Sequence, residues 1–105
     1  MKIVNRGFIT VRPKQAFVEW ANQQDVEFQI DLNAEPTVYL IEEDFFDVEP
    51  IVESKFKQIF LCELDAVSDN EEGFPEITMS VFKEWFSLEV GSMVIDLEKE
   101  DLVGD

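Results

Sequence analysis

The sequence contains no histidine. This absence removes the most common general base, the usual catalytic zinc ligand, and every Ser-His or Cys-His nucleophile pair. The single cysteine, Cys62, cannot form an internal disulfide, and no basic residue lies beside it in sequence to stabilise a thiolate. The sequence therefore argues against an enzyme, and Cys62 is expected to be a buried structural residue.

Glycine is also scarce. Four scattered glycines make no glycine-rich loop that could hold a phosphate group. The acidic clusters at 42–44 and 65–72 lack the D-x-[DN]-x-[DN]-G spacing of a calcium loop. No cofactor and no metal ion are therefore expected.

Long apolar runs are missing as well. No run approaches the roughly 18 residues of a membrane span, and the N-terminus lacks the long apolar region of a signal peptide. The expected compartment is the cytoplasm, without contact to a membrane.

Basic residues are few. The chain has 8 basic and 24 acidic residues, a net charge of −16 and a pI near 4.1. Four of the basic residues lie in the first fifteen positions, so the rest of the chain sets 24 acids against four lysines. Long-range repulsion disfavours direct contact with nucleic acid, and the natural electrostatic partner is a protein with a basic surface. The alternative is that the charge serves only solubility.

Apolar residues, in contrast, are plentiful. Of 105 residues, 46% are hydrophobic and 12% are aromatic, which predicts a folded core rather than a disordered acidic chain. The length fits a single domain over residues 1–105. The acidic tail, residues 98–105, is expected to fray.

Two stretches of the chain resemble each other at an offset of 65 residues. Phe17–Leu32 and Phe82–Leu97 share Phe, Glu and Trp at their starts and Ile-Asp-Leu at their ends. This internal pseudo-repeat predicts a short aromatic helix that is followed, twice, by an apolar strand. Because Trp20 and Trp85 occupy equivalent positions, we expect both in the core rather than on a ligand-binding surface.

Hydrophobic periodicity predicts the remaining elements. Alternation indicates strands at 3–12, 26–32, 37–42 and 88–97, the last with a bulge at Gly91–Ser92. The short link between the second and third strands predicts a hairpin, with 37–42 as an inner strand. A period of 3.6 indicates helices at 13–23 and 48–67, the longer one capped by Asp47, and a short third helix capped by Thr78 or Ser80.

These elements follow the order β-α-β-β-α-β with one extra short helix. That order is the split βαβ, or ferredoxin-like, α+β arrangement, in which helices cover one face of an antiparallel sheet. A different α+β topology stays open. In the ferredoxin-like case, the uncovered face would be a partner-binding surface that carries Glu27, Gln29, Asp31 and Asp96.

Arg6, Arg12 and Lys14 form the one basic cluster in the sequence. They surround the junction of the first strand and first helix, where a helix N-terminus favours anions. We expect an anion site there, or alternatively ion pairs between these residues and carboxylates of the chain itself.

The stretch V-N-R-G-F-I-T-V-R-P-K-Q-A-F-V-E-W at 4–20, with Y-L-I-E and F-K-E-W-F…S-M-V-I-D-L later, resembles a family of small acidic bacterial proteins. The resemblance spans most of the chain. It implies a bacterial cytoplasmic protein and, because that family has no assigned activity, it carries over no site residue.

Three functions remain, in order of preference. The first is a non-catalytic acidic domain that binds or regulates a basic protein partner, in a narrower form as a nucleic-acid mimic. The second is a structural protein that forms homodimers or larger homo-oligomers. The third is a carboxylate-based enzyme or a small-anion binder at the Arg12/Lys14 junction.

Overall fold

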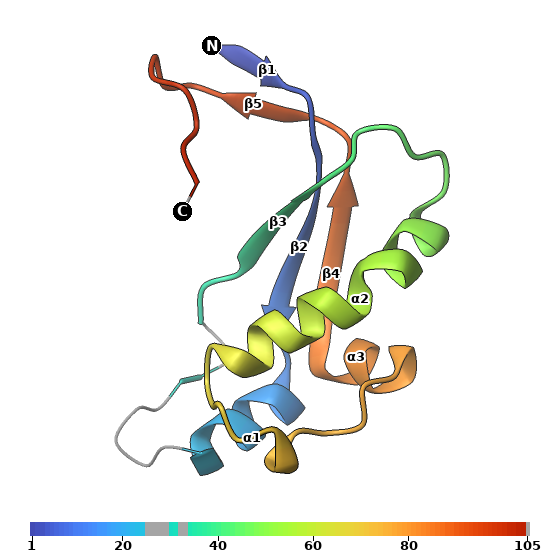
Figure 1. Ribbon diagram of the computed structural model, residues 1–105, viewed down its shortest axis with the longest axis vertical. Helices are drawn as coiled ribbons and strands as arrows, with labels where there is room; N and C mark the ends of the chain where they lie inside the picture. The colour runs from blue at the N-terminus through green and yellow to red at the C-terminus, as the bar shows by residue number, and fades with distance from the viewer. Residues whose placement is uncertain (25–29, 32–33, 105) are drawn as a thin grey trace.

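The computed structural model describes residues 1–24, 30–31 and 34–104 (Figure 1). Within these ranges the fold is α+β, with a two-stranded and a three-stranded antiparallel sheet. Its elements are β1 (Lys2–Val4), β2 (Gly7–Pro13), α1 (Gln15–Gln24), β3 (Thr37–Ile41), α2 (Val48–Asp65), the 3-10 turn η1 (Glu71–Gly73), α3 (Met79–Trp85), β4 (Phe86–Gly91) and β5 (Val94–Asp96). No helix of the described residues is long and apolar enough to cross a membrane.

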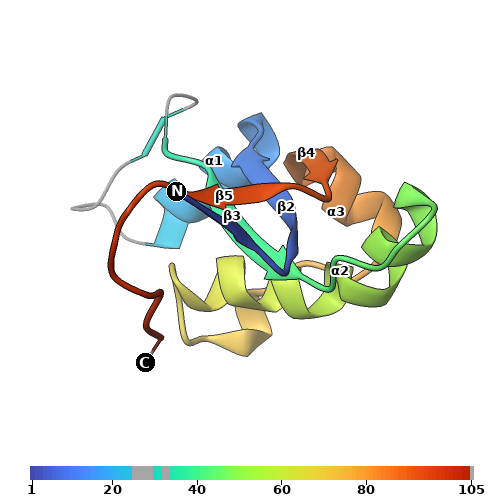
Figure 2. The same cartoon turned by 90° about the horizontal axis from the view of Figure 1, so that it is seen from above.

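The three-stranded sheet has the order β3-β2-β4, with β2 in the middle. Ile9 lies opposite Tyr39 on one side and Val90 on the other. Residues at odd positions of β2 are buried, because α2 crosses that face of the sheet, while α1 and α3 lie at the end where β2 stops (Figure 1). The view from above shows α2 on one side of the strands (Figure 2).

The opposite face of this sheet is mixed, with exposed apolar residues on β3 and with exposed Arg12 of β2 and Glu89 of β4. Val38 and Leu40 of β3 are 56% and 46% exposed, and they lie opposite Thr10 and Phe8. Alternation along a strand places these side chains away from α2. No helix of the described residues covers them.

The predicted acidic partner face is not assembled on this sheet by the described residues. Glu27 and Gln29 lie outside the described residues. Asp31 is exposed but belongs to no strand. Asp96 is in β5, which pairs with β1 in the separate two-stranded sheet.

The predicted strands 3–12 and 88–97 are each divided in two. β1 and β5 form a separate ribbon, with Ile3 opposite Ile95, that runs across the top of the main sheet (Figure 1). Between the Val4–Val94 and Phe8–Gly91 pairs lie three residues on one strand and two on the other. The extra residue is thus on the Asn5–Gly7 side, and the predicted bulge at Gly91–Ser92 is on the wrong strand.

The predicted hairpin of 26–32 with 37–42 falls largely outside the described residues. Ile30 and Asp31 are in no strand, and β3 pairs with β2 at the edge of the described sheet. The expectation that 37–42 is an inner strand, and the strand half of the pseudo-repeat, are therefore not confirmed.

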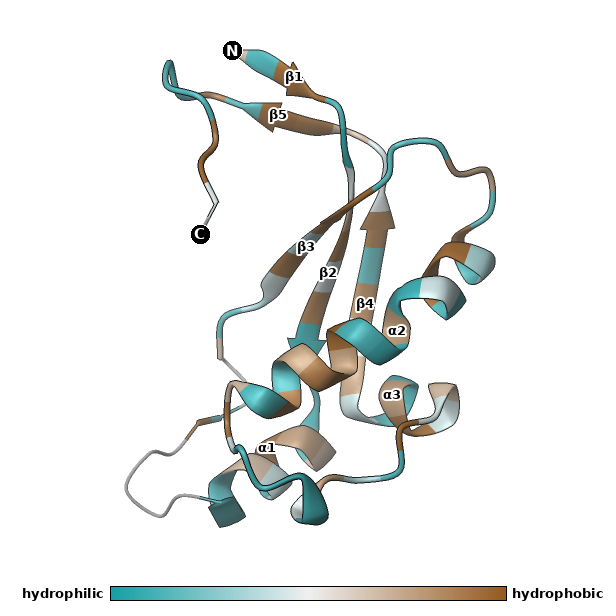
Figure 3. Cartoon of the chain, viewed as in Figure 1, coloured by the Kyte–Doolittle hydropathy of each residue, from teal (hydrophilic) through white to brown (hydrophobic). Residues whose placement is uncertain are grey.

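The long helix is confirmed. α2 begins after Asp47, although the Asp47 side chain makes no capping hydrogen bond. Its buried residues recur at helical spacing, so one stripe faces the sheet while hydrophilic residues alternate with it around the helix (Figure 3). The members of that stripe are Ile51, Val52, Phe56, Ile59, Phe60 and Leu64.

Aromatic side chains of α1, α2 and α3 meet in the core. The ring centroids of Trp20 and Trp85 are 5.8 Å apart, and Phe17 lies 6.1 Å from Trp85. The Trp20 indole donates a hydrogen bond of 2.8 Å to the Gly73 carbonyl, so its one polar atom is satisfied. Trp20 is therefore a core residue, as predicted, whereas Trp85 is partly buried and packs against the core.

Two further expectations concern single residues. Thr78 caps α3, since its hydroxyl accepts from the Val81 N–H at 3.2 Å, which confirms the predicted cap. The expectation that Cys62 is buried is wrong, because its thiol is exposed. Cys62 lies only about 20° around α2 from the buried Ile51, three turns away, so its position around the helix does not by itself reveal its exposure.

Candidate functional site

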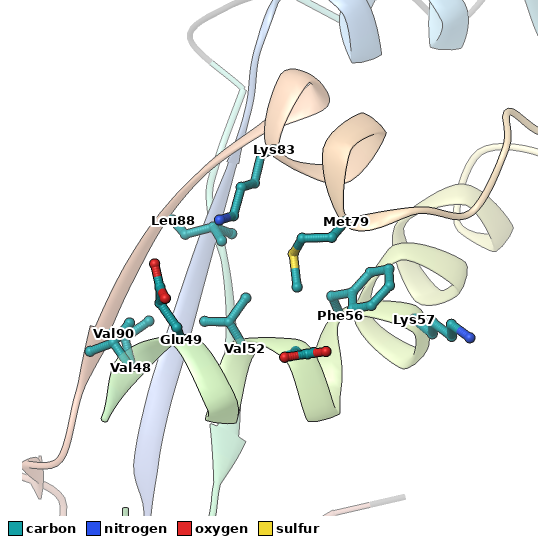
Figure 4. A pocket seen from close by; sticks show the side chains of 10 residues that line it. Val48, Glu49, Val52, Phe56, Lys57, Met79, Lys83, Leu88 and Val90 are labelled. Atoms are coloured by element: carbon teal, nitrogen blue, oxygen red, sulfur yellow. The ribbon is translucent and has the colours of Figure 1, made fainter. Parts of the chain in front are cut away.

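A groove of about 810 Å³ lies between α2, α3 and β4 (Figure 4). Three segments that are far apart in sequence form it, and six of its ten lining residues are apolar. They are Val48, Val52, Phe56, Met79, Leu88 and Val90, with the charged Glu49, Glu53, Lys57 and Lys83. We call this site the groove. Its volume is within the range of about 300–1,000 Å³ typical of ligand sites.

Regular spacing within each element brings these residues into the groove. Val48, Val52 and Phe56 are four residues apart on α2 and form one row along the helix. Glu49, Glu53 and Lys57 form the neighbouring row. On β4, Leu88 and Val90 are two residues apart and therefore point to the same face of the sheet.

The groove has a buried floor and an open mouth. Val52 and Phe56 are buried, whereas Val48 is 50% exposed. In Figure 4, Met79 extends toward Phe56, and Lys83 extends from α3 toward Leu88. An apolar group could therefore enter past Val48 and make contact with side chains that already pack against the core.

Four charged groups line the groove without forming ion pairs within the described ranges: Glu49, Glu53, Lys57 and Lys83. Glu49, Glu53 and Lys57 lie on successive turns of α2, and Lys83 lies on α3, on the other side of the groove from Lys57 (Figure 4). Unpaired charges beside apolar floor residues suit a ligand that combines apolar and charged groups along its length.

The polar side chains of the groove are carboxylates and ammonium groups. Its lining residues include no cysteine, serine or threonine that could act as a nucleophile. Among the described residues, no three Asp, Glu or Cys side chains gather in a way that could hold a metal ion.

The predicted anion site is not one cluster. Arg6 precedes β2 and its guanidinium donates to the Asn5 carbonyl at 2.7 Å. Arg12 is six residues further along, which in an extended strand is about 20 Å. Neither Arg12 nor Lys14 lines the groove.

Lys14 has a structural contact instead. Its ammonium donates to the Lys83 carbonyl at 2.9 Å, and its backbone N–H donates to the Trp85 carbonyl at 2.8 Å. Cations near the last carbonyls of a helix interact favourably with its dipole. Lys14 therefore ties the end of β2 to the last turn of α3.

Sequence reasoning missed the groove. Its signal is visible in retrospect: the apolar row of α2 begins at Val48, a full turn before Val52, the first buried residue of that row. Only the placement of β4 beside α2 shows that this turn faces an open space.

A hydrogen-bonded pair of polar side chains lies near the C-terminal end of α2, away from the groove. The Tyr39 hydroxyl of β3 donates a hydrogen bond to the Glu63 carboxylate. Burial, and next the hydrogen bond to Glu63, raises the pKa of Tyr39 well above its ordinary value.

This contact makes stability depend on alkaline pH. Below about pH 10 Tyr39 is protonated in both folded and unfolded chains, but above it only the unfolded chain loses the proton, so the free energy of unfolding falls. Because the chain has one tyrosine, its absorbance titration reports this group alone. We expect a midpoint above the ordinary value, and a smaller loss of stability between about pH 9 and about pH 11 for Tyr39→Phe. An ordinary midpoint would contradict the contact.

The chain matches no family model, no curated protein and no solved structure. Its function therefore has to be inferred from the groove and from the charge of the chain.

Proposed function

We propose that this chain is a non-catalytic acidic domain that binds a basic protein partner, and that the partner docks in the groove. The observation that carries the proposal is an open apolar groove whose charged residues are unpaired, on a chain of net charge −16. The domain would act in the cytoplasm of a bacterium, as its resemblance to small acidic bacterial proteins implies.

Apolar contact would supply affinity, while charge would supply the attraction at long range. Full burial of one large apolar side chain is worth about 1.5–3 kcal/mol. The net charge steers a basic partner toward the domain and disfavours acidic ones. This division predicts binding that weakens with salt and that also depends on the groove.

The sheet order supports the ferredoxin-like arrangement as part of this proposal. If the second strand of a split βαβ sheet is left out, its fourth, first and third strands lie side by side in that order. In this chain β4, β2 and β3 lie side by side in the same order. The packing of Phe17 and Trp20 beside Trp85 also fits two related halves.

A homo-oligomer is the second candidate. The observation in its favour is the ribbon of β1 and β5, where Ile3 and Ile95 face each other across the two strands and are both exposed. A two-stranded ribbon is marginally stable on its own in water, so a covering partner would stabilise it.

The proposal is tested by capture of partners on immobilised protein, with Val48→Arg as the groove variant. Half-exposed Val48 tolerates a longer side chain, and arginine at the mouth of the groove repels a basic partner. We expect wild type to retain a basic protein at about 0.15 M salt, and Val48→Arg to retain about tenfold less. Retention should fall at about 1 M salt, where the screening length shortens from about 8 Å to about 3 Å.

The matched control is Val103→Arg, the same change at an exposed position of the C-terminal tail. It alters the net charge as Val48→Arg does and should retain the partner. Equal retention by Val48→Arg, or no basic protein retained by wild type, would overturn the proposed function.

A further inference from the structure

We infer that the groove takes up an extended segment of the basic partner, which adds to β4 as a further strand of the sheet. This inference rests on the proposed function and names how the partner is bound.

The long helix α2 extends beyond the sheet. A helix of 18 residues is about 27 Å long, whereas three strands place their outer axes only about 10 Å apart. The first turns of α2 project past β4, which is the outermost strand on that side (Figure 1). The groove lies under these turns, where a neighbouring strand would continue the sheet.

The outer edge of β4 is open. Within the described residues no strand pairs with its outer side, so alternate backbone N–H and C=O groups face outward. Proteins usually block such edges with lysine, proline or a bulge. The sequence of β4, F-S-L-E-V-G, contains neither lysine nor proline, and its one charged residue is the exposed Glu89 on the face away from α2.

The side chains of an added strand would fit the groove. Such a strand would run about 4.8 Å from β4, and every second side chain would point toward α2. Those side chains would enter the groove beside Leu88 and Val90 and meet Val48 and Val52 from the helix. The occupant is therefore a segment that alternates apolar residues with polar ones.

Charge decides which partner supplies that segment. Glu49 and Glu53 of the groove can pair with lysine or arginine of the segment, while Lys57 and Lys83 balance their charge in the lining, so it is the net charge of −16 of the whole chain that favours a basic segment. A second copy of this chain is a poor occupant, because two molecules of charge −16 repel each other and the exposed Glu89 lies on the same edge strand.

The test uses synthetic peptides and the full chain. One short peptide alternates lysine and valine, and its control has the same composition with the valines in one block. Both carry equal charge, so only the alternating peptide presents a single apolar face as a strand. We expect it to bind at least about tenfold more tightly, measured by calorimetry, and Val48→Arg to lose this difference.

Backbone pairing is tested by N-methylation of alternate residues of the alternating peptide. Two methylated peptides are made, one at the lysines and one at the valines. Methylation of the residues whose amides face β4 should abolish binding, and methylation of the other residues should be tolerated. Hydrogen exchange should slow at every second amide of Ser87–Gly91 when the peptide binds.

The failures can be told apart. If both methylated peptides bind as well as the parent, or if a basic protein is retained through the groove while no peptide binds, strand addition is overturned and the proposed function stands. If neither a basic protein nor a peptide binds, both are overturned. If the free chain sediments at twice 12.2 kDa and Val48→Arg restores the monomer, a second copy occupies the groove and the inference is overturned.

Discussion

Replacement of Phe60 by alanine is expected to lower the free energy of unfolding by about 3–5 kcal/mol. Phe60 is completely buried on α2. Its ring centroid lies 5.4 Å from that of Phe82, 5.9 Å from Trp85 and 5.8 Å from Phe86. These neighbours belong to α3 and β4, so the ring joins the helix to the elements that build the rest of the core.

The cost has two parts. Alanine loses the transfer free energy of the ring, and rigid neighbours leave a cavity that they fill only in part. Since a domain of this size has a stability of about 5–15 kcal/mol, Phe60→Ala could remove much of it.

Urea denaturation followed by tryptophan fluorescence measures this change. Phe46→Ala is the matched control, because the same atoms are removed from a side chain that is 104% exposed, and its effect should stay within about 0.5 kcal/mol. Phe60→Leu, which keeps most of the volume, should lie between the two. Equal effects of Phe60→Ala and Phe46→Ala would mean that α2 does not pack on α3 through this ring.

Gly7→Ala is expected to destabilise the fold by about 1–3 kcal/mol through steric overlap. A Cβ at Gly7 would lie 2.9 Å from the Gly91 carbonyl oxygen, 2.9 Å from a ring carbon of Phe45 and 3.1 Å from the Glu42 carbonyl oxygen. Two of these atoms are backbone, so a side-chain rotation cannot relieve the contact. No described glycine has a positive φ, and the cost therefore comes from space alone.

Gly104→Ala is the control, because nothing lies within 4 Å of a Cβ at that position. Gly91→Ala provides a second comparison. Its nearest atoms belong to the Phe8 ring at 2.4 Å, a half-buried side chain on the uncovered face of the sheet that can turn aside. Thermal melts should rank Gly7→Ala as the least stable of the three, and a different ranking would contradict the close approach at Gly7.

Local signals predicted the helices well. The spacing of Ile51, Phe56 and Phe60 indicated α2 because a helix repeats every 3.6 residues, whatever it packs against. Thr78 was a predictable cap, since a hydroxyl at a helix start satisfies a backbone N–H within its own turn.

Strand boundaries depend on partners, and there the predictions were less accurate. Alternation at 88–97 runs through Ser92 and Met93, but β4 pairs with β2 and β5 pairs with β1. The break exists because three residues lie between Val4 and Phe8 on the partner segment, whereas two lie between Gly91 and Val94. The alternation within 88–97 contains no information on the length of the partner segment. The burial of Cys62 was predicted wrongly for a similar reason. How much of the surface of a helix is buried depends on the elements that pack against it, and not on the helix alone.

By itself, the sequence determined the properties that depend on composition and on short spacings: a folded acidic α+β chain without histidine, three helices, and tryptophans that pack in or against the core. Tertiary structure alone decided the groove. Its walls come from 48–57, 79–83 and 88–90, and the space exists because α2 is longer than the sheet is wide and β4 is an edge strand. Both are relations between distant segments, and no local pattern of residues contains them.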